Sequence, residues 1–203
     1  VTILATGARE AKSHPMLEYP NVITQRDLEE KVIHHPEEIA ALKDVVMIQC
    51  VQPEGTAFYC SRVCCTNTMK NAIRIKLFNP TCNVTVLYRN IVTYGFREEY
   101  YTDARKLGVV FVRYTEENPP RVYYDEDYDR MRVRVHDLNL DRELDLASDL
   151  IPLSMSILPS EGTLKMADML RVPLSSEGFF KEAQMKLRPM DFMREGIFLA
   201  GMA

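Results

Sequence analysis

Four of the five cysteines of this 203-residue chain lie within residues 50–65, at Cys50, Cys60, Cys64 and Cys65. Four thiolates are suitable ligands for a 4Fe–4S cluster or for a tetrahedral zinc ion. Buried free thiols or a disulfide are the simpler alternatives. So many cysteines in so short a stretch, in a chain without features of secretion, favour a metal site. Residue types alone do not separate iron–sulfur from zinc.

The elements around these cysteines determine what they can do. Residues 45–51 form a continuous apolar run of strand length, typical of a central parallel strand, and Cys50 lies at its carboxyl end. The other three cysteines are expected to begin a helix over about residues 60–78. A Rossmann domain carries its glycine-rich pyrophosphate turn at this position. That triplet is absent here, so we infer that thiols replace the nucleotide site. An NAD(P)H-binding dehydrogenase remains an alternative by fold analogy alone.

A helix amino terminus would suit thiolate ligands. Its partial positive charge lowers thiol pKa values, and its free N–H groups can donate to sulfur. We expect Cys60 and Cys64, one turn apart, to share a helix face, with Cys65 adjacent and Cys50 closing the site from the strand. Cys82 precedes the next strand and is expected in the core.

Hydrophobic periodicity predicts the rest of the fold. Strands over 83–88 and 109–114 alternate with a helix over 98–107, which completes a βαβαβ unit with a parallel sheet. From about residue 121 apolar and polar residues alternate, as in an antiparallel meander. Smaller elements are expected as follows: a helix over 25–35 capped by Thr24 and Asp27, a strand over 150–153, a helix over 164–170 and a strand over 178–180.

Composition excludes several classes of protein. The chain is 46% hydrophobic and 27% charged with a formal net charge of −4, which argues against a nucleic-acid-binding protein. No apolar run has the length of a membrane span, and no signal segment is visible. We therefore expect a cytoplasmic globular protein.

Both ends of the chain are apolar. Residues 1–5 and 197–201 have the character of buried strands, whereas natural termini are usually polar and frayed. We expect a piece of a larger protein that lacks the partners of these strands. The expected division is a stub and linker over 1–25, a Rossmann-like domain with the cysteine site over 26–154, and a return segment over 155–203.

Several segments resemble the A-subunit family of heterodisulfide reductase and related proteins of quinone-interacting oxidoreductase complexes. The resemblance covers nearly the whole chain. It rests on these segments: 46–51, 59–66, 86–89, 93–99 and 187–189. More distantly, the layout is similar to thioredoxin-reductase-type flavoproteins, in which a nucleotide-type domain is inserted into an FAD domain. The resemblance thus implies an inserted domain flanked by FAD-domain stubs.

The resemblance also implies a function. In that family electrons pass between FAD and iron–sulfur clusters inside multisubunit complexes, and Cys50, Cys60, Cys64 and Cys65 match its cluster ligands. It implies an oxidoreductase whose partners are the other subunits, and no turnover by this segment alone. An isolated segment could lose its cluster; FAD would belong to the full-length protein. Without cluster chemistry, the alternative is a structural zinc or assembly module.

Four further residues are candidates for flavin contact by the same resemblance. Thr6, Gly7 and Gly201 would contact FAD through their backbone, or they form ordinary turns at strand ends. Lys70, one to two turns beyond the cysteines, would stabilise reduced, anionic flavin electrostatically, or it is a solvated helix lysine.

Overall fold

The computed structural model describes residues 1–56 and 58–203 and divides into two compact units. The larger unit contains residues 12–156. The smaller unit combines residues 1–11 with residues 157–203. Each unit is described by itself.

The larger unit is built on a five-stranded parallel sheet. Its strand order is β3 (Val22–Thr24), β10 (Ile151–Met155), β4 (Asp44–Val51), β5 (Asn83–Tyr88) and β6 (Val110–Arg113). The expected α/β class and the βαβαβ unit are confirmed. Because β4 lies at the centre of the sheet and is almost wholly buried, its sequence is a continuous apolar run.

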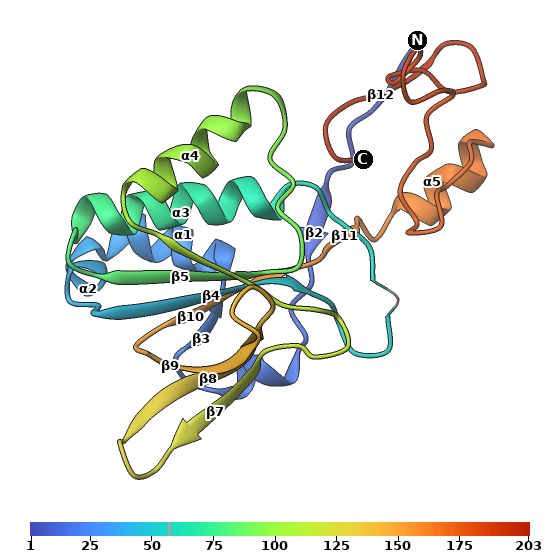
Figure 1. Ribbon diagram of the computed structural model, residues 1–203. Helices are drawn as coiled ribbons and strands as arrows, with labels where there is room; N and C mark the ends of the chain where they lie inside the picture. The colour runs from blue at the N-terminus through green and yellow to red at the C-terminus, as the bar shows by residue number, and fades with distance from the viewer. Residues whose placement is uncertain (57) are drawn as a thin grey trace. The chain divides into compact units, whose positions relative to one another are not determined.

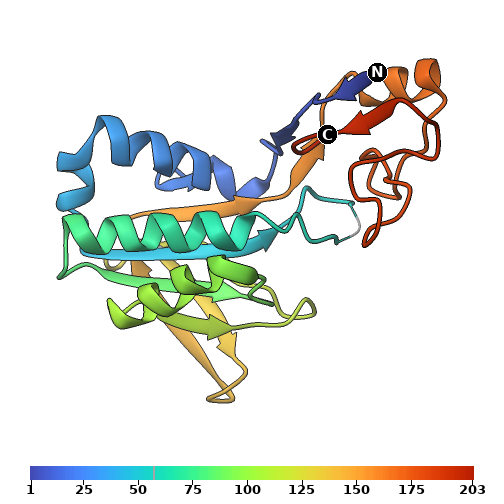
Figure 2. The same cartoon turned by 90° about the horizontal axis from the view of Figure 1, so that it is seen from above.

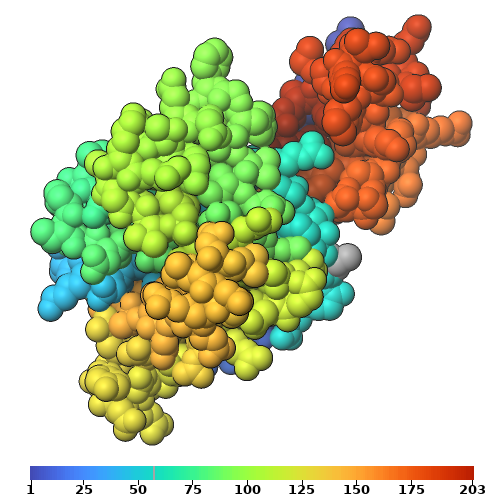
Figure 3. Space-filling view, in the orientation of Figure 1, coloured from blue at the N-terminus to red at the C-terminus, as the bar shows by residue number. Residues whose placement is uncertain are grey.

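Helices cover one face of this sheet and a second sheet covers the other (Figure 1). The helices of this unit are α1 (Gln25–His34), α2 (Pro36–Ala40), α3 (Cys64–Phe78) and α4 (Glu98–Lys106), with 3-10 turns η1 (Pro15–Glu18) and η2 (Gly95–Arg97). The second sheet is the expected antiparallel meander of β7 (Arg121–Asp125), β8 (Arg130–Asp137) and β9 (Arg142–Ser148). Seen from above, α3 runs along β4 (Figure 2). In the space-filling view the meander side chains form a continuous yellow and orange surface below those of α4 (Figure 3).

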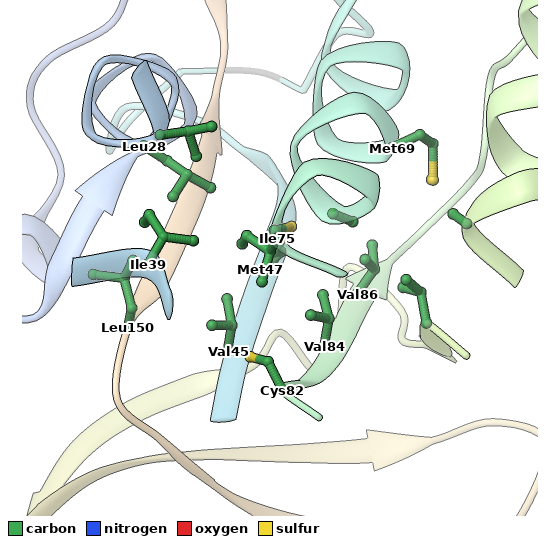
Figure 4. Close-up of a cluster of buried hydrophobic side chains, with 14 residues drawn as sticks. Leu28, Ile39, Val45, Met47, Met69, Ile75, Cys82, Val84, Val86 and Leu150 are labelled. Carbon is green, nitrogen blue, oxygen red and sulfur yellow. The ribbon is translucent and has the colours of Figure 1, made fainter. Parts of the chain in front are cut away.

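The core between helices and sheet explains the apolar spacing of the sequence. Val45 and Met47, at alternate positions of β4, lie on the face of the sheet that the helices cover. They pack in one cluster with Met69 and Ile75 of α3 (Figure 4). Cys82 is fully buried in the same cluster, as expected. It lies at the amino end of β5, whereas the other four cysteines lie at the carboxyl end of β4 or beyond it.

The helix boundaries agree with most of the expectations. Thr24 and Asp27 form the expected capping box at the start of α1, which ends at His34. Within α1, Leu28 and Val32 are buried, but Ile33 is 57% exposed. On α3, Leu77 and Phe78 are also exposed, because the last turn of this helix extends past the core.

The smaller unit contains short elements. β1 (Thr2–Leu4) pairs in parallel with β12 (Ile197–Leu199), and β2 (Ala8–Glu10) pairs antiparallel with β11 (Ile157–Pro159). The two terminal apolar runs therefore pair with each other, although only Leu4 of β1 is buried. α5 (Thr163–Leu170) forms as expected, while the strand expected over 178–180 is reduced to one bridge between Leu174 and Phe180. None of the helices in the described part of the chain could cross a membrane.

Candidate metal centre

All four clustered cysteines line a single pocket in the larger unit, at the carboxyl end of β4. The space within it is about 520 Å³, including its open mouth. Besides the thiols, Gln49, Val92 and Ser156 are among the residues that line it. We call this the cysteine pocket. Residues separated by more than a hundred positions in the chain thus meet around the thiols.

Cys50 is held in an unusual backbone conformation at the end of β4. Ile48 pairs with Leu153 and Val51 pairs with Met155, so β4 advances three residues while β10 advances two. The extra residue is a β-bulge, and Cys50 has a positive φ of 61°. Non-glycine residues seldom adopt this conformation, and such strain concentrates at functional sites. The bulge ends the regular alternation of β4 at the edge of the pocket.

The start of α3 differs from the expected one. The helix begins at Cys64, not near Cys60, because the preceding Arg62 has a left-handed φ of 62° that no helix accommodates. Cys60 is therefore exposed in the loop, and the expectation that it shares a helix face with Cys64 is wrong. Cys65 is buried and Cys64 is partly buried. The site thus draws its thiols from a strand end, a loop and a helix start.

Backbone groups surround the two thiols of the helix. The N–H of Val92 donates to Cys65 Sγ at 3.3 Å. As thiols, Cys65 and Cys64 donate to the carbonyl oxygens of Asn90 and Met155, at 3.7 and 3.8 Å. Deprotonation would remove those two weak donors but keep the bond from Val92, which suits a sulfur that carries negative charge.

Burial, not the helix terminus, dominates the acidity of these thiols. Burial raises the pKa of Cys64 to about 12, opposed by a hydrogen bond from Ser61. It raises the pKa of Cys65 to about 11, opposed by the N–H of Val92. Burial also raises the pKa of Cys50, opposed by the N–H groups of Arg89 and Asn90. The expectation of lowered pKa values is thus wrong for these three thiols: desolvation outweighs the dipole.

The sulfur atoms lie too far apart for a compact ion site. Among the described residues, no three of the four cysteine sulfurs lie within 4.8 Å of one another. Tetrahedral zinc with Zn–S bonds of about 2.3 Å requires sulfur atoms about 3.8 Å apart. Among the described residues, the group whose ligand atoms do lie within 4.8 Å of one another is His35, Glu37 and Glu38, which are exposed on α2 and at its amino-terminal cap. The four thiols are therefore not gathered at the spacing of a single tetrahedral zinc ion.

The candidate flavin-contact residues lie in both units. In the larger unit, Lys70 Nζ forms an ion pair with Glu29 of α1 at 2.6 Å. In the smaller unit, Gly7 and Gly201 have positive φ values of 67° and 74° at strand ends. The hydroxyl of Thr6 is buried without a hydrogen-bond partner among the described residues.

Two polar residues of the cysteine pocket are additional to those that we singled out in the sequence. Gln49 is 0% exposed, and neither atom of its amide has a partner in the described part of the chain. The hydroxyl of Ser156, which is 2% exposed, also has none. The sequence contained one signal for this site: Gln49 is the only polar residue between Val45 and Val51 apart from the cysteine itself.

Sequence comparison identifies relatives over most of the chain. No family model matches it. The A subunit of ferredoxin:CoB-CoM heterodisulfide reductase from Methanosarcina acetivorans is 39% identical over 79% of this chain and 20% of that protein. The iron-sulfur A subunit of CoB–CoM heterodisulfide reductase from Methanocaldococcus jannaschii is 35% identical over 91% of this chain and 30% of that protein. The chain thus spans about a third of these relatives or less.

Structural comparison shows the fold. Thioredoxin reductase of T. acidophilum aligns with 98% of this chain and 56% of its own, with a TM-score of 0.59 and 13% identity. An NAD-dependent persulfide reductase of A. fulgidus aligns with 98% of this chain and 32% of its own, with a TM-score of 0.52 and 21% identity. The expected thioredoxin-reductase-type architecture is confirmed. By sequence, the chain is a relative of the A subunit of heterodisulfide reductase, matching a part of such proteins rather than their full length.

Proposed function

We propose that this chain is the cluster-bearing electron-transfer segment of a heterodisulfide-reductase-like oxidoreductase, and that Cys50, Cys60, Cys64 and Cys65 hold a 4Fe–4S cluster. The observation that carries the proposal is the convergence of all four thiols on one pocket from three separate elements. A relative of this chain is named as an iron-sulfur protein of such a reductase, which agrees with it. When bound, such a cluster accepts and releases one electron at a time.

The residues present suit this group in three ways. Four sulfur donors match the usual ligand set of the cluster. Their spacing exceeds what a single tetrahedral ion needs. The N–H of Val92 already points at Cys65 Sγ, and hydrogen bonds to sulfur are one means by which proteins adjust cluster potentials.

The second part of the proposal concerns electron transfer in the full-length protein. We propose that electrons pass there between FAD and this cluster, and that the other subunits of a heterodisulfide-reductase-like complex are the partners. Thr6, Gly7 and Gly201 would contact FAD through their backbone, and Lys70 would lie near the flavin and offset negative charge on it. The positive φ values of the two glycines support turns that a backbone contact requires.

The test is metal analysis after anaerobic reconstitution with iron and sulfide, followed by electron paramagnetic resonance of the reduced protein. We expect about four irons and four sulfides per chain and a signal from a reduced cluster. Cys64→Ala should lose both, whereas Cys82→Ala, a buried cysteine outside the pocket, should keep them. Stoichiometric zinc without sulfide would support the structural alternative instead. Absence of both metals after reconstitution would refute the metal site.

A further inference from the structure

Two polar side chains line the cysteine pocket in addition to its thiols. Gln49 and Ser156 line it from β4 and from the residue that follows β10. Both side chains are almost completely buried, and their amide and hydroxyl atoms have no partner among the described residues. A buried polar group without a hydrogen bond destabilises the fold. Two such groups on one pocket indicate that an occupant of the pocket satisfies them.

Gln49 lies where its side chain can reach that occupant. Along β4, Val45 and Met47 alternate toward α3 and pack against Met69, so Gln49 belongs to the same face. This places it beneath the amino end of α3, where Cys64 and Cys65 begin the helix. Its backbone carbonyl accepts a hydrogen bond from the Tyr114 hydroxyl at 2.5 Å, which fixes this part of β4.

The chemistry of the groups defines the occupant. A glutamine amide offers two N–H donors and a serine hydroxyl offers one. The lining thiols, once deprotonated, are acceptors that carry negative charge, and so are the sulfides of an iron–sulfur cluster. Donors and acceptors therefore face the same space.

We propose that the Gln49 amide and the Ser156 hydroxyl donate hydrogen bonds to sulfur atoms of the group held by the four cysteines, and thereby raise its reduction potential. This inference rests on the proposed function. Reduction adds one electron and no proton, so the reduced group carries one more negative charge. Donors directed at sulfur stabilise the more negative state, and the potential rises.

The experiment is a redox titration of the anaerobically reconstituted chain, followed by electron paramagnetic resonance. Gln49→Met keeps the approximate volume and removes both N–H donors. We expect its ratio of reduced to oxidised protein at a fixed potential to fall about tenfold, equivalent to about 59 mV for one electron. Ser156→Ala should shift the potential in the same direction by less.

The matched control is Gln25→Met. Gln25 is also a buried glutamine of the larger unit, but its amide oxygen accepts from Asn71 at 2.9 Å and it does not line the cysteine pocket. This substitution should leave the potential unchanged, which separates a specific effect from general loosening of the core.

The outcomes distinguish this inference from the proposed function. A wild-type chain that binds no iron and sulfide would overturn both. A wild-type chain that binds them, with a Gln49→Met variant of unchanged potential, would overturn only the inference. Should Gln49→Met fail to fold, Ser156→Ala decides: an unchanged potential in that variant overturns the inference, and a lowered one supports it.

Discussion

The two ends of the parallel sheet are built differently. At the amino end, polar side chains bond to one another and to the backbone. Asp149 accepts from the N–H groups of Lys43 and Asp44 at 2.7 and 3.0 Å, and Arg130 pairs with the carboxylates of Asp44 and Asp149 at 3.1 and 3.4 Å. We call this the amino-end network. At the carboxyl end lies the cysteine pocket, where buried polar atoms have no partners in the described part of the chain.

This difference indicates what each end is for. A network whose members satisfy one another stabilises the fold and needs no ligand. A pocket with unpaired amides, buried thiols and a strained Cys50 costs stability, which a bound group can repay. In the described part of the chain, the polar groups of the amino-end network are paired with one another, whereas the cysteine pocket holds buried polar atoms that are unpaired. The same division is general in open parallel sheets, where ligands bind at the carboxyl ends of strands.

Removal of Asp149 should give the largest effect on stability. Asp149→Ala leaves two backbone N–H groups without their acceptor and removes one of the two carboxylates that pair with Arg130. Hydrogen bonds to charged groups contribute about 1.5–3 kcal/mol each to stability. Because Asp149 is partly exposed, we expect a loss of about 3 kcal/mol in the free energy of unfolding. Urea denaturation of the metal-free chain measures it.

The same variant tests the division between the two ends. Asp149→Ala should bind as much iron and sulfide as the wild-type chain under conditions in which it is folded. A selective loss of iron from the folded variant would show that the two ends are coupled, and would contradict the comparison.

At the amino end, a pH effect should follow from Cys82. Burial raises the pKa of its thiol to about 11, with Lys76 opposing the rise and the carboxylates of Asp44 and Asp149 adding to it. The unfolded thiol ionises near pH 8.5. The stabilisation is therefore complete below about pH 8.5 and is lost as the pH rises toward 11.

The measurement compares unfolding free energies at about pH 8 and pH 10.5 for the wild-type chain and Cys82→Ala. The wild-type chain should lose about 1–3 kcal/mol more than the variant over this interval. Equal losses in both proteins would show that Cys82 does not titrate with a shifted pKa.

At the carboxyl end, a substitution should raise the free energy of unfolding, whereas Asp149→Ala at the amino end lowers it. Gln49→Met replaces an unsatisfied buried amide by an apolar side chain of similar size, so the metal-free chain should become more stable by about 1–2 kcal/mol. Loss of stability by a similar amount would indicate that the amide has partners after all. Urea denaturation of the metal-free proteins gives the result. In the comparison variant, Gln25→Met, the amide that is lost has an oxygen that accepts from Asn71 at 2.9 Å and a nitrogen without a partner among the described residues, so the gain in stability should be smaller than for Gln49→Met.

The contrast also explains which features the sequence could predict. The period of the apolar residues predicted β4, β5 and the meander, because burial on two faces or one face leaves a direct pattern in the sequence. The left-handed residues Cys50 and Arg62 leave no such pattern, so the bulge and the later start of α3 were missed. The pairing of β1 with β12 was also missed, because it depends on residues nearly two hundred positions apart.

The site itself was predictable in part. Four thiols near one strand end were visible from spacing, and the structure places them on one pocket. For Cys50, Cys64 and Cys65 the direction of the pKa shift was predicted wrongly, because their burial depends on residues of the pocket lining that are remote in sequence, such as Ser156. Gln49 was visible as a polar residue in an apolar strand, but only the fold shows that its amide has no partner among the described residues.

Lys70 should give the smallest effect, and it tests whether a charge on α3 belongs to the fold or to function. Its ion pair with Glu29 is short, but both side chains are about one-third exposed. Pairs of this kind contribute about 0.2–1 kcal/mol. Lys70→Met should therefore change the unfolding free energy of the chain by less than about 1 kcal/mol, and Glu29→Gln should behave alike.

A loss of about 2 kcal/mol or more would exceed the range of such pairs. It would assign Lys70 to the structural framework, as with Asp149, and would weaken its proposed role near the flavin. A small loss in unfolding free energy would agree with that role, because it would show that the fold depends little on the charge of Lys70.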